Sequence, residues 1–178
     1  MELLAIPGSV REGSFNFALL NAASKLSPNN INIKVIDSIQ DIPIFNPDID
    51  VNEIPESVNS LIARIRTSDG VIISTPEYAH GIPGALKNTL DWLVSSDALV
   101  LKPVVATSVS TSALGGARSH HSLVLILSAM NSNIVVDGSL NVPFAHNKFD
   151  GHSNLTDNIT EKALIVSLTA FERAINNA

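Results

Sequence analysis

Short apolar runs alternate with longer segments of helical periodicity along the chain, and this alternation limits the possible folds more than any single motif does. The apolar runs lie at residues 3–6, 31–36, 69–74, 103–109 and 133–136. The segments of helical character lie at residues 17–23, 56–67, 84–93, 117–130 and 155–175. Strands that alternate with helices are typical of parallel α/β folds. We therefore predict a doubly wound, five-stranded parallel sheet in the order 2-1-3-4-5, with helices on both faces.

Composition narrows the class of protein further. The chain has 178 residues, of which 45% are hydrophobic, so it can bury roughly 70% of its unfolded surface, and we predict one domain over residues 1–178. Its net charge of -6 and scattered basic residues argue against a nucleic-acid partner. The chain has no cysteine, so redox chemistry would need a bound cofactor.

No apolar run approaches the roughly 20 residues of a membrane span, and no secretory signal is evident. We expect a cytoplasmic protein without a membrane partner.

Three polar loops follow the first, third and fourth apolar runs, at residues 7–16, 75–84 and 110–116. Those three strands are neighbours in the predicted order, and ligands of such sheets bind beyond the carboxyl ends of the strands where the winding reverses. The three loops should therefore line one crevice. The proline- and acid-containing segment 41–55 is predicted to be a surface excursion, and segment 137–154 to be irregular.

The first loop has the composition of an anion site. It joins a strand to the start of a helix, where free backbone N–H groups and the helix dipole favour negative charge. Ser9, Ser14 and Asn16 add neutral donors, and Arg11 adds a cation. Neither a nucleoside-triphosphate loop nor the dinucleotide glycine pattern is present, so one terminal phosphate fits best. The alternative is a purely structural role, in which these residues only cap the helix and form turns.

The second and third loops suit a planar ring. Two prolines and two glycines stiffen the second loop around Tyr78, and the third offers backbone donors near Gly115 and Gly116. A planar heterocycle with one terminal phosphate is what flavin mononucleotide (FMN) looks like. The chain has no GxSxG motif, and the adjacent His120 and His121 diverge on a helix. We therefore predict neither hydrolase chemistry nor a metal site.

Motifs in all three loops resemble those of the NADPH-dependent FMN reductases, and most closely the flavodoxin-like quinone, chromate and azo-compound reductases. The matching segments are 8–16 (GSVREGSFN), 76–78 (PEY), 82–88 (IPGALKN), 91–92 (DW) and 115–118 (GGAR). The resemblance covers nearly the whole chain and implies a flavodoxin-like fold. The residues it implies for FMN are Ser9, Arg11, Ser14, Phe15 and Asn16 around the phosphate, Pro76, Glu77, Tyr78 and Ala79 along the ring, and Ser108, Gly115 and Gly116 near its pyrimidine side.

The resemblance also implies an activity. NADPH or NADH would reduce bound FMN, leave, and be replaced in the same pocket by a small-molecule electron acceptor such as a quinone, azo compound, flavin or metal oxyanion. No side chain is expected to be catalytic, because the flavin accepts the hydride. The alternative is a flavodoxin-like electron carrier that binds FMN without oxidising NAD(P)H. Against the carrier, only 4% of the residues are aromatic, which leaves the ring less enclosed. The resemblance implies that the chain forms a homodimer, with a homotetramer as the alternative.

The roles of four residues near the ring are left open. Tyr78, His80 and Arg118 are candidates for substrate contact, although Arg118 could instead bind the cofactor or a neighbouring subunit. Glu77 could equally be a solvated acid or the partner of a nearby cation. The family usually has Asn after this tyrosine, where Ala79 stands here, so substrate preference is expected to differ.

Overall fold

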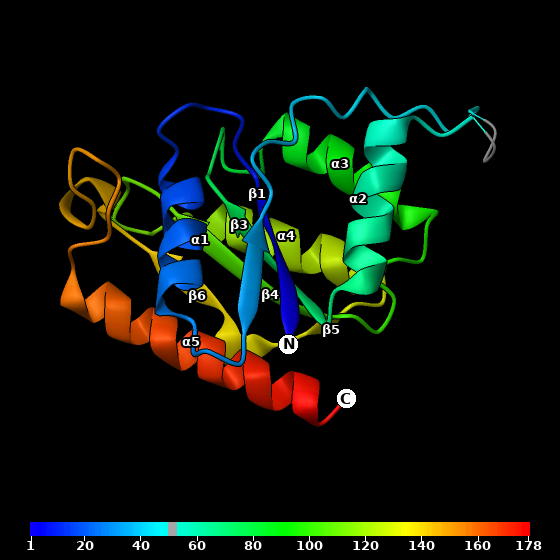
Figure 1. Cartoon of the computed structure of the whole chain (residues 1–178). Coiled ribbons are helices and arrows are strands. Elements are labelled where there is room, and N and C mark those ends of the chain that lie inside the picture. The colour runs from blue at the N-terminus through cyan, green and yellow to red at the C-terminus, as the bar shows by residue number, and fades with distance from the viewer. Residues whose placement is uncertain (50–52) are drawn as a thin grey trace.

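A parallel β-sheet with helices on both faces forms the centre of the computed structural model, which describes residues 1–49 and 53–178 (Figure 1). The sheet order is β2-β1-β3-β4-β5, as predicted, and a sixth strand, β6, also pairs with β4. The elements in chain order are β1 (Glu2–Pro7), α1 (Phe15–Leu26), β2 (Asn32–Val35), α2 (Glu56–Thr67), β3 (Gly70–Thr75), α3 (Gly84–Val94), β4 (Pro103–Val109), α4 (Ala117–Ala129), β5 (Asn133–Ile134), the 3-10 helix η1 (Val136–Gly138), β6 (Leu140–Val142), the 3-10 helix η2 (Ala145–Asn147) and α5 (Asn158–Asn176).

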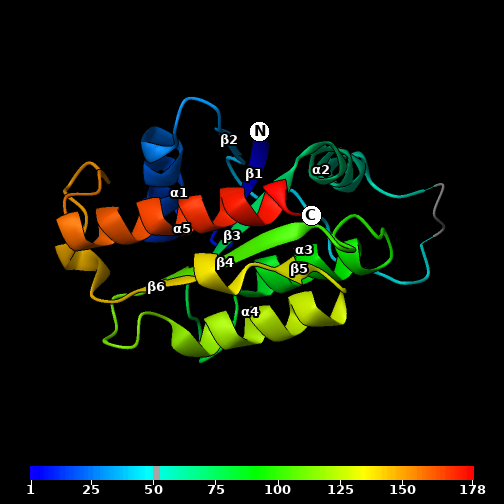
Figure 2. The same ribbon diagram turned by 90° about the horizontal axis from the view of Figure 1, so that it is seen from below.

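The burial of each strand follows from its place in the sheet. All residues of β3 and β4 are buried, as expected for continuous apolar strands with both faces covered. In β2, Ile33 is buried between the exposed Asn32 and Lys34, which fits the predicted edge strand. The two apolar layers lie on opposite faces (Figure 2): α1 and α5 cover one, and α2, α3 and α4 cover the other.

The end of the sheet differs from the prediction. The fifth strand was expected over residues 133–136, followed by an irregular stretch. Instead β5 ends at Ile134, η1 follows, and β6 returns to the same neighbour strand. β5 pairs with the first residues of β4, and β6 with its last three, Thr107 to Val109. Gly138 permits this step, because a Cβ there would lie 2.7 Å from Val105 Cγ2.

The first part of the surface excursion, residues 41–49, is fixed to α3. Asn88 Oδ1 accepts a hydrogen bond from Phe45 N at 2.8 Å, and its Nδ2 donates to Pro43 O at 2.9 Å. Trp92 Nε1 also donates to Pro43 O, at 2.8 Å, and the Trp92 ring meets Phe45 edge-on. Trp92 is therefore a core residue, 4% exposed. Residues 50–52 of the predicted excursion lie outside the described residues.

The closing helix α5 begins at Asn158, three residues later than predicted, with Asp157 as its cap. Hydrogen bonds from the Thr160 hydroxyl and N–H, together with Lys148, lower the pKa of Asp157 to about 2. None of the helices in the described ranges has the length and apolar content needed to cross a membrane.

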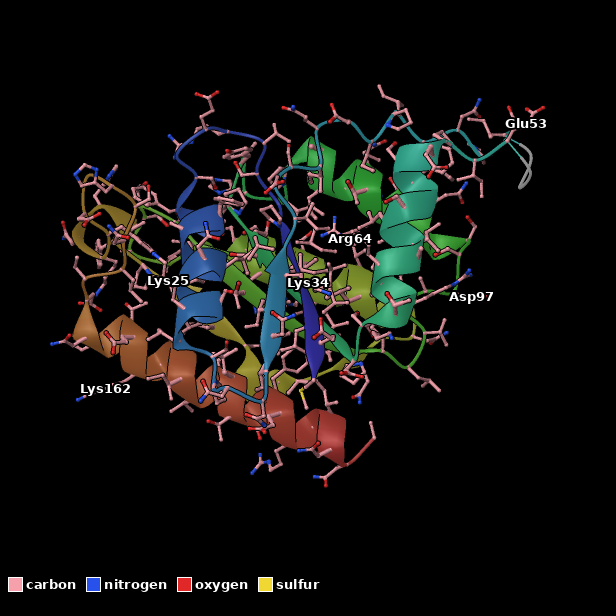
Figure 3. All side chains as sticks on the ribbon, viewed as in Figure 1. Lys25, Lys34, Glu53, Arg64, Asp97 and Lys162 are labelled. Atoms are coloured by element: carbon pink, nitrogen blue, oxygen red, sulfur yellow. The ribbon has the colours of Figure 1, made fainter. Side chains whose placement is uncertain are left out.

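The basic side chains Lys25, Lys34, Arg64 and Lys162 come from four separate elements (Figure 3).

Candidate functional site

A cleft of about 340 Å³ lies beyond the carboxyl ends of β1, β3 and β4. The loop between β1 and α1 lies at this end of the sheet (Figure 1). The volume of the cleft is in the range of small-molecule and cofactor sites. This is the crevice that the sheet order predicts. The lining residues are Ser9, Arg11, Ser14, Phe15, Asn16, Pro76, Glu77, Tyr78, Val109, Ser110, Thr111 and His146.

The loop from Gly8 to Ser14 directs hydrogen-bond donors into the cleft. Ser14 is the N-cap of α1, and its buried Oγ accepts from Asn16 N at 3.3 Å. Ser9 is also buried, and its Oγ accepts from Arg11 N at 3.2 Å. The Arg11 side chain is exposed, with Nη2 donating to Gly13 O at 3.3 Å. Hydroxyls, one guanidinium and a helix N-terminus form a donor set that suits a phosphate.

Asn16 connects this loop to the strands on the other side of the cleft. Its Nδ2 donates to Val109 O at 3.1 Å. Its Oδ1 accepts from Val109 N at 3.1 Å and from Ser74 Oγ at 2.8 Å. The side chain is 2% exposed and joins α1 to the ends of β3 and β4. It therefore fixes the distance between the first and third loops, and one Nδ2 hydrogen remains for a ligand.

The second loop makes a tight two-residue turn. Tyr78 and Gly81 exchange both backbone hydrogen bonds at 3.0 Å. Between them Ala79 and His80 have φ values of 48° and 65°. Positive φ is strained for most residues with a Cβ, so such a turn favours Gly, which has none, and Asn, which tolerates this conformation. Tyr78 is half exposed, and its hydroxyl lies 3.3 Å from Ser9 Oγ, so it joins the first two loops at the cleft.

The Glu77 carboxylate joins the second loop to the start of α4. Its Oε2 accepts from Arg118 N at 3.1 Å and Ser119 N at 3.4 Å. Its Oε1 lies 3.3 Å from His80 Nδ1 and 3.6 Å from Arg118 Nη1. Burial favours a higher pKa for Glu77, but the hydrogen bonds from His80, Ser119 and Arg118 and the Arg118 charge outweigh it and lower that pKa. Glu77 thus caps a helix whose own N-cap, Gly116, has no side chain.

The third loop is held by a buried serine at the end of β4. Ser108 is fully buried, its hydroxyl donates to Gly115 O at 2.7 Å, and it lies 3.0 Å from the Asn141 side-chain amide. Gly115 and Gly116 have φ values of 59° and 80°. A Cβ at Gly115 would lie 3.0 Å from Pro143 N, and one at Gly116 would lie 3.2 Å from Ser108 Cβ. These three residues shape the loop that carries Ser110 and Thr111 into the cleft.

The structure brings most of the predicted site residues together. Among the described residues, the cleft lining includes the following predicted cofactor residues: Ser9, Arg11, Ser14, Phe15, Asn16, Pro76, Glu77 and Tyr78. It does not include Ala79, Ser108, Gly115 or Gly116, nor the substrate candidates His80 and Arg118, which contact Glu77 at its border. In residues 1–49 and 53–178, no three His, Asp or Glu side chains are grouped as metal ligands would be.

Sequence reasoning missed four lining residues. Val109 ends β4, and Ser110 and Thr111 lie in the third loop, whose position was predicted although these residues were not singled out. His146 lies in the stretch predicted to be irregular, and no sequence pattern pointed to it. It enters the cleft because β6 carries the chain back to the carboxyl end of β4.

Similarity to known proteins agrees with this geometry. The family model for NADPH-dependent FMN reductase matches residues 1–147. The chain is 34% identical over 175 residues to a quinone reductase of Escherichia coli strain K12, covering 96% of this chain and 93% of that protein. It is 29% identical over 174 residues to an NAD(P)H-dependent FMN reductase of Pseudomonas aeruginosa, covering 97% and 94%.

A solved structure is similar over almost the full length. FerB, a flavoenzyme NAD(P)H:(acceptor) oxidoreductase from Paracoccus denitrificans, superposes with a TM-score of 0.88 at 27% identity, covering 99% of this chain and 97% of that one. The fold, the cleft at the strand ends and the match over residues 1–147 lead to one assignment. The chain belongs to the NADPH-dependent FMN reductase family, a family of flavodoxin-like oxidoreductases.

Proposed function

We propose that this protein is an FMN-containing reductase that oxidises NADPH or NADH and reduces small acceptors such as quinones, azo compounds, flavins or metal oxyanions. The observation that carries the proposal is the cleft itself, which combines a phosphate-binding donor set with a proline-stiffened wall at the switch point of the sheet. The names of the relatives from Escherichia coli and Pseudomonas aeruginosa support both the cofactor and the class of reaction.

The cleft residues fit FMN at both ends. Ser9, Arg11, Ser14 and the N–H groups at the start of α1 would bind the phosphate. Pro76 and the backbone of residues 77–79 would lie along the isoalloxazine ring, with the third loop near its pyrimidine side. When bound, FMN supplies the hydride acceptor and donor. The role of this chain is to bind and orient, and we assign no side chain to acid–base catalysis.

Reductant and acceptor would use the same open side of the cleft in turn, which is a ping-pong scheme. Tyr78 is 48% exposed at this border, so a planar substrate has an aromatic surface to contact. His80 and Arg118 lie 3.2 Å apart beside it and would contact the anionic groups of the reductant. The Glu77 carboxylate already accepts hydrogen bonds from the start of α4. It would therefore affect the reductant by positioning His80 and Arg118.

Replacing Arg11 by Ala tests the assignment of the phosphate end. Loss of a charge-assisted contact of about 1.5–3 kcal/mol should weaken FMN binding about 10- to 100-fold. The kcat of the FMN-saturated enzyme should change little, because Arg11 holds the phosphate and not the reacting ring. Fluorescence titration of apoprotein with FMN measures the affinity, and NADPH oxidation with a quinone measures turnover. Arg64→Ala, on the distant helix α2, is the matched control.

Three results would contradict parts of this proposal. Unchanged FMN affinity in Arg11→Ala together with a lower kcat would show that Arg11 acts elsewhere. A yellow, FMN-loaded protein that oxidises neither NADH nor NADPH would be an electron carrier. A purified protein that takes up no added FMN would be neither a reductase of this kind nor a carrier.

We also propose that the protein assembles as a homodimer and acts in the cytoplasm, where NAD(P)H is available. Leu114 at the third loop and Leu125 on α4 are each 57% exposed, and exposed apolar side chains of this size are suited to a subunit contact. Light scattering after gel filtration should give about twice the chain mass of 18.9 kDa; four times that mass would indicate a homotetramer. Cell fractionation would test the compartment.

A further inference from the structure

A fourth loop, residues 143–147, lies at the cleft beside the three that the sequence predicts. β6 pairs with the last residues of β4, so the chain that follows β6 emerges at the same edge of the sheet as loops one to three. Val109 is paired with Val142, and Val109 itself lines the cleft. Segment 143–147 is therefore a structural part of the site.

Backbone hydrogen bonds fix this fourth loop to the third. Phe144 N donates to Ser112 O at 3.2 Å, and Ala145 N donates to Ser110 O at 3.1 Å. Ser110 N in turn donates to Val142 O at 3.1 Å. Phe144 has a φ of 52°, a conformation that is costly for an aromatic residue and persists only where the surroundings enforce it. The residues after Phe144 thus have a defined place at the cleft.

His146 is the residue of this loop that lines the cleft. Its ring meets Phe15 edge-on, with ring centroids 5.2 Å apart and planes at 87°. Phe15 is the first residue of α1, and its ring also packs against that of Phe149, with ring centroids 5.5 Å apart. The exposed imidazole therefore lies beside the helix N-terminus where the phosphate donors are. Among the described residues it has no hydrogen-bond partner, so its nitrogens can serve a ligand.

The charges around His146 favour an anionic ligand. Arg11 and Glu77 are the charged side chains that share the cleft lining with it, and Glu77 is paired with Arg118 and His80. On its own segment, Lys148 is paired with Asp157 at 3.1 Å, and Asp150 accepts hydrogen bonds from His152 and Asn154. No unpaired carboxylate of the described lining residues competes for a protonated His146.

We propose that His146 is a second cationic contact for the FMN phosphate, next to Arg11, and that its protonation makes FMN affinity depend on pH. This inference rests on the proposed function and adds a residue to its cofactor site. Histidine is the side chain whose charge changes between about pH 8 and 5, and a phosphate monoester loses its second negative charge only around pH 6. Protonation of His146 would therefore add a cation to the site while the ligand remains mostly dianionic.

Titration of the apoprotein with FMN at about pH 6.5 and 8.5 tests the inference. If the charged contact is worth about tenfold in affinity, the wild type should bind FMN more tightly at the lower pH, by up to about tenfold. His146→Gln, which keeps a polar side chain without the charge, should lose most of this dependence. Because the phosphate titrates equally in both proteins, the difference between them isolates His146. His152→Gln, a second exposed histidine away from the cleft lining, is the matched control and should behave as wild type.

Riboflavin, which lacks the phosphate, separates the two ends of the ligand. Its affinity should not differ between His146→Gln and wild type at either pH. An equal pH dependence of FMN binding in His146→Gln and wild type would overturn the inference and leave the proposed function intact. The same holds if His146→Gln changes riboflavin binding as much as FMN binding, since the contact would then be to the ring or ribityl chain. Failure of the wild type to bind FMN at any pH would instead refute the proposed function.

Discussion

At the scale of single residues, two polar side chains join the loops of the cleft over long stretches of sequence. Asn16 bonds to the backbone of Val109, 93 residues away, and Glu77 bonds to the backbone of Arg118, 41 residues away. Asn16 was predicted as a cofactor residue from its place in the first loop, and Glu77 from the family resemblance. Their side-chain contacts are largely with the protein itself, so each also positions the residues that line the cleft.

Glu77→Gln should lower the melting temperature at pH 7 by about 2–4 °C, as expected for the loss of a charge-assisted helix cap in a chain of this size. The pKa of Glu77 lies below its ordinary value of 4.5. Its stabilising contribution is therefore present above about pH 4.5 and is lost as the pH falls through the lowered pKa. The melting curves of variant and wild type should converge below that pH.

Thermal melts followed by circular dichroism between pH 7 and 3 measure this convergence. Glu56→Gln is the control, because Glu56 is an exposed glutamate in the first turn of α2, and its side chain makes no hydrogen bond or ion pair with the residues that the structure describes. A difference between Glu77→Gln and wild type that stays constant across the pH range would rule out the carboxylate as the source of the stabilisation.

At the scale of elements, the start of α4 depends on a glycine and on a side chain from another loop. Gly116 has a φ of 80°, and Glu77 supplies the cap that Gly116 cannot. The helix N-terminus is therefore coupled to the second loop. Changes at Gly116 should alter both the stability of α4 and the place of Arg118 at the cleft.

Gly116→Ala should destabilise the protein by about 1–2 kcal/mol, because the left-handed conformation is strained for alanine. Its Cβ would also lie 3.2 Å from Ser108 Cβ and 3.3 Å from Ser119 Oγ. Gly84→Ala is the matched substitution: no described atom lies within 4 Å of a Cβ there, and its φ is not positive. It should be neutral or stabilise by up to about 1 kcal/mol. Urea denaturation gives both values, and equal effects of the two changes would contradict the argument.

At the scale of the whole molecule, one sheet separates two apolar layers. Trp92 and Leu90 belong to the layer under α2, α3 and α4, and Phe171 and Leu19 to the layer under α1 and α5. The strands β1, β3 and β4 contribute side chains to both layers. We therefore propose that residues 1–178 form a single cooperative domain.

Trp92 allows a direct test, because it is the only tryptophan of the chain and is buried in one of the two layers. Its fluorescence and the far-ultraviolet circular dichroism should report the same urea midpoint. FMN at 100 times its dissociation constant should raise the free energy of unfolding seen by both probes by about 2.7 kcal/mol. Separate midpoints for the two probes would show that the layers unfold independently.

The sequence by itself determined the sheet order and the place of the cleft. Periodicity is a local property, so the first four predicted strands and the helices at 56–67 and 117–130 agree closely with the structure. The order then required the three loops to meet, and eight predicted residues lie together in the cleft lining. The short strands could not be predicted from periodicity, because the two residues of β5 and the three of β6 are too few to show a period.

The tertiary structure alone decided which side chains face the cleft and which support it. His146 reaches the cleft because β6 pairs with β4, and the Ser108 hydroxyl donates to Gly115 O and does not line the cleft. Glu77 is bound to α4 because that helix has no side chain of its own at the N-cap. Such contacts join residues tens of positions apart, and only packing in three dimensions brings them within hydrogen-bond distance. Local patterns therefore fixed where the site is, whereas long-range contacts fixed what each residue does there.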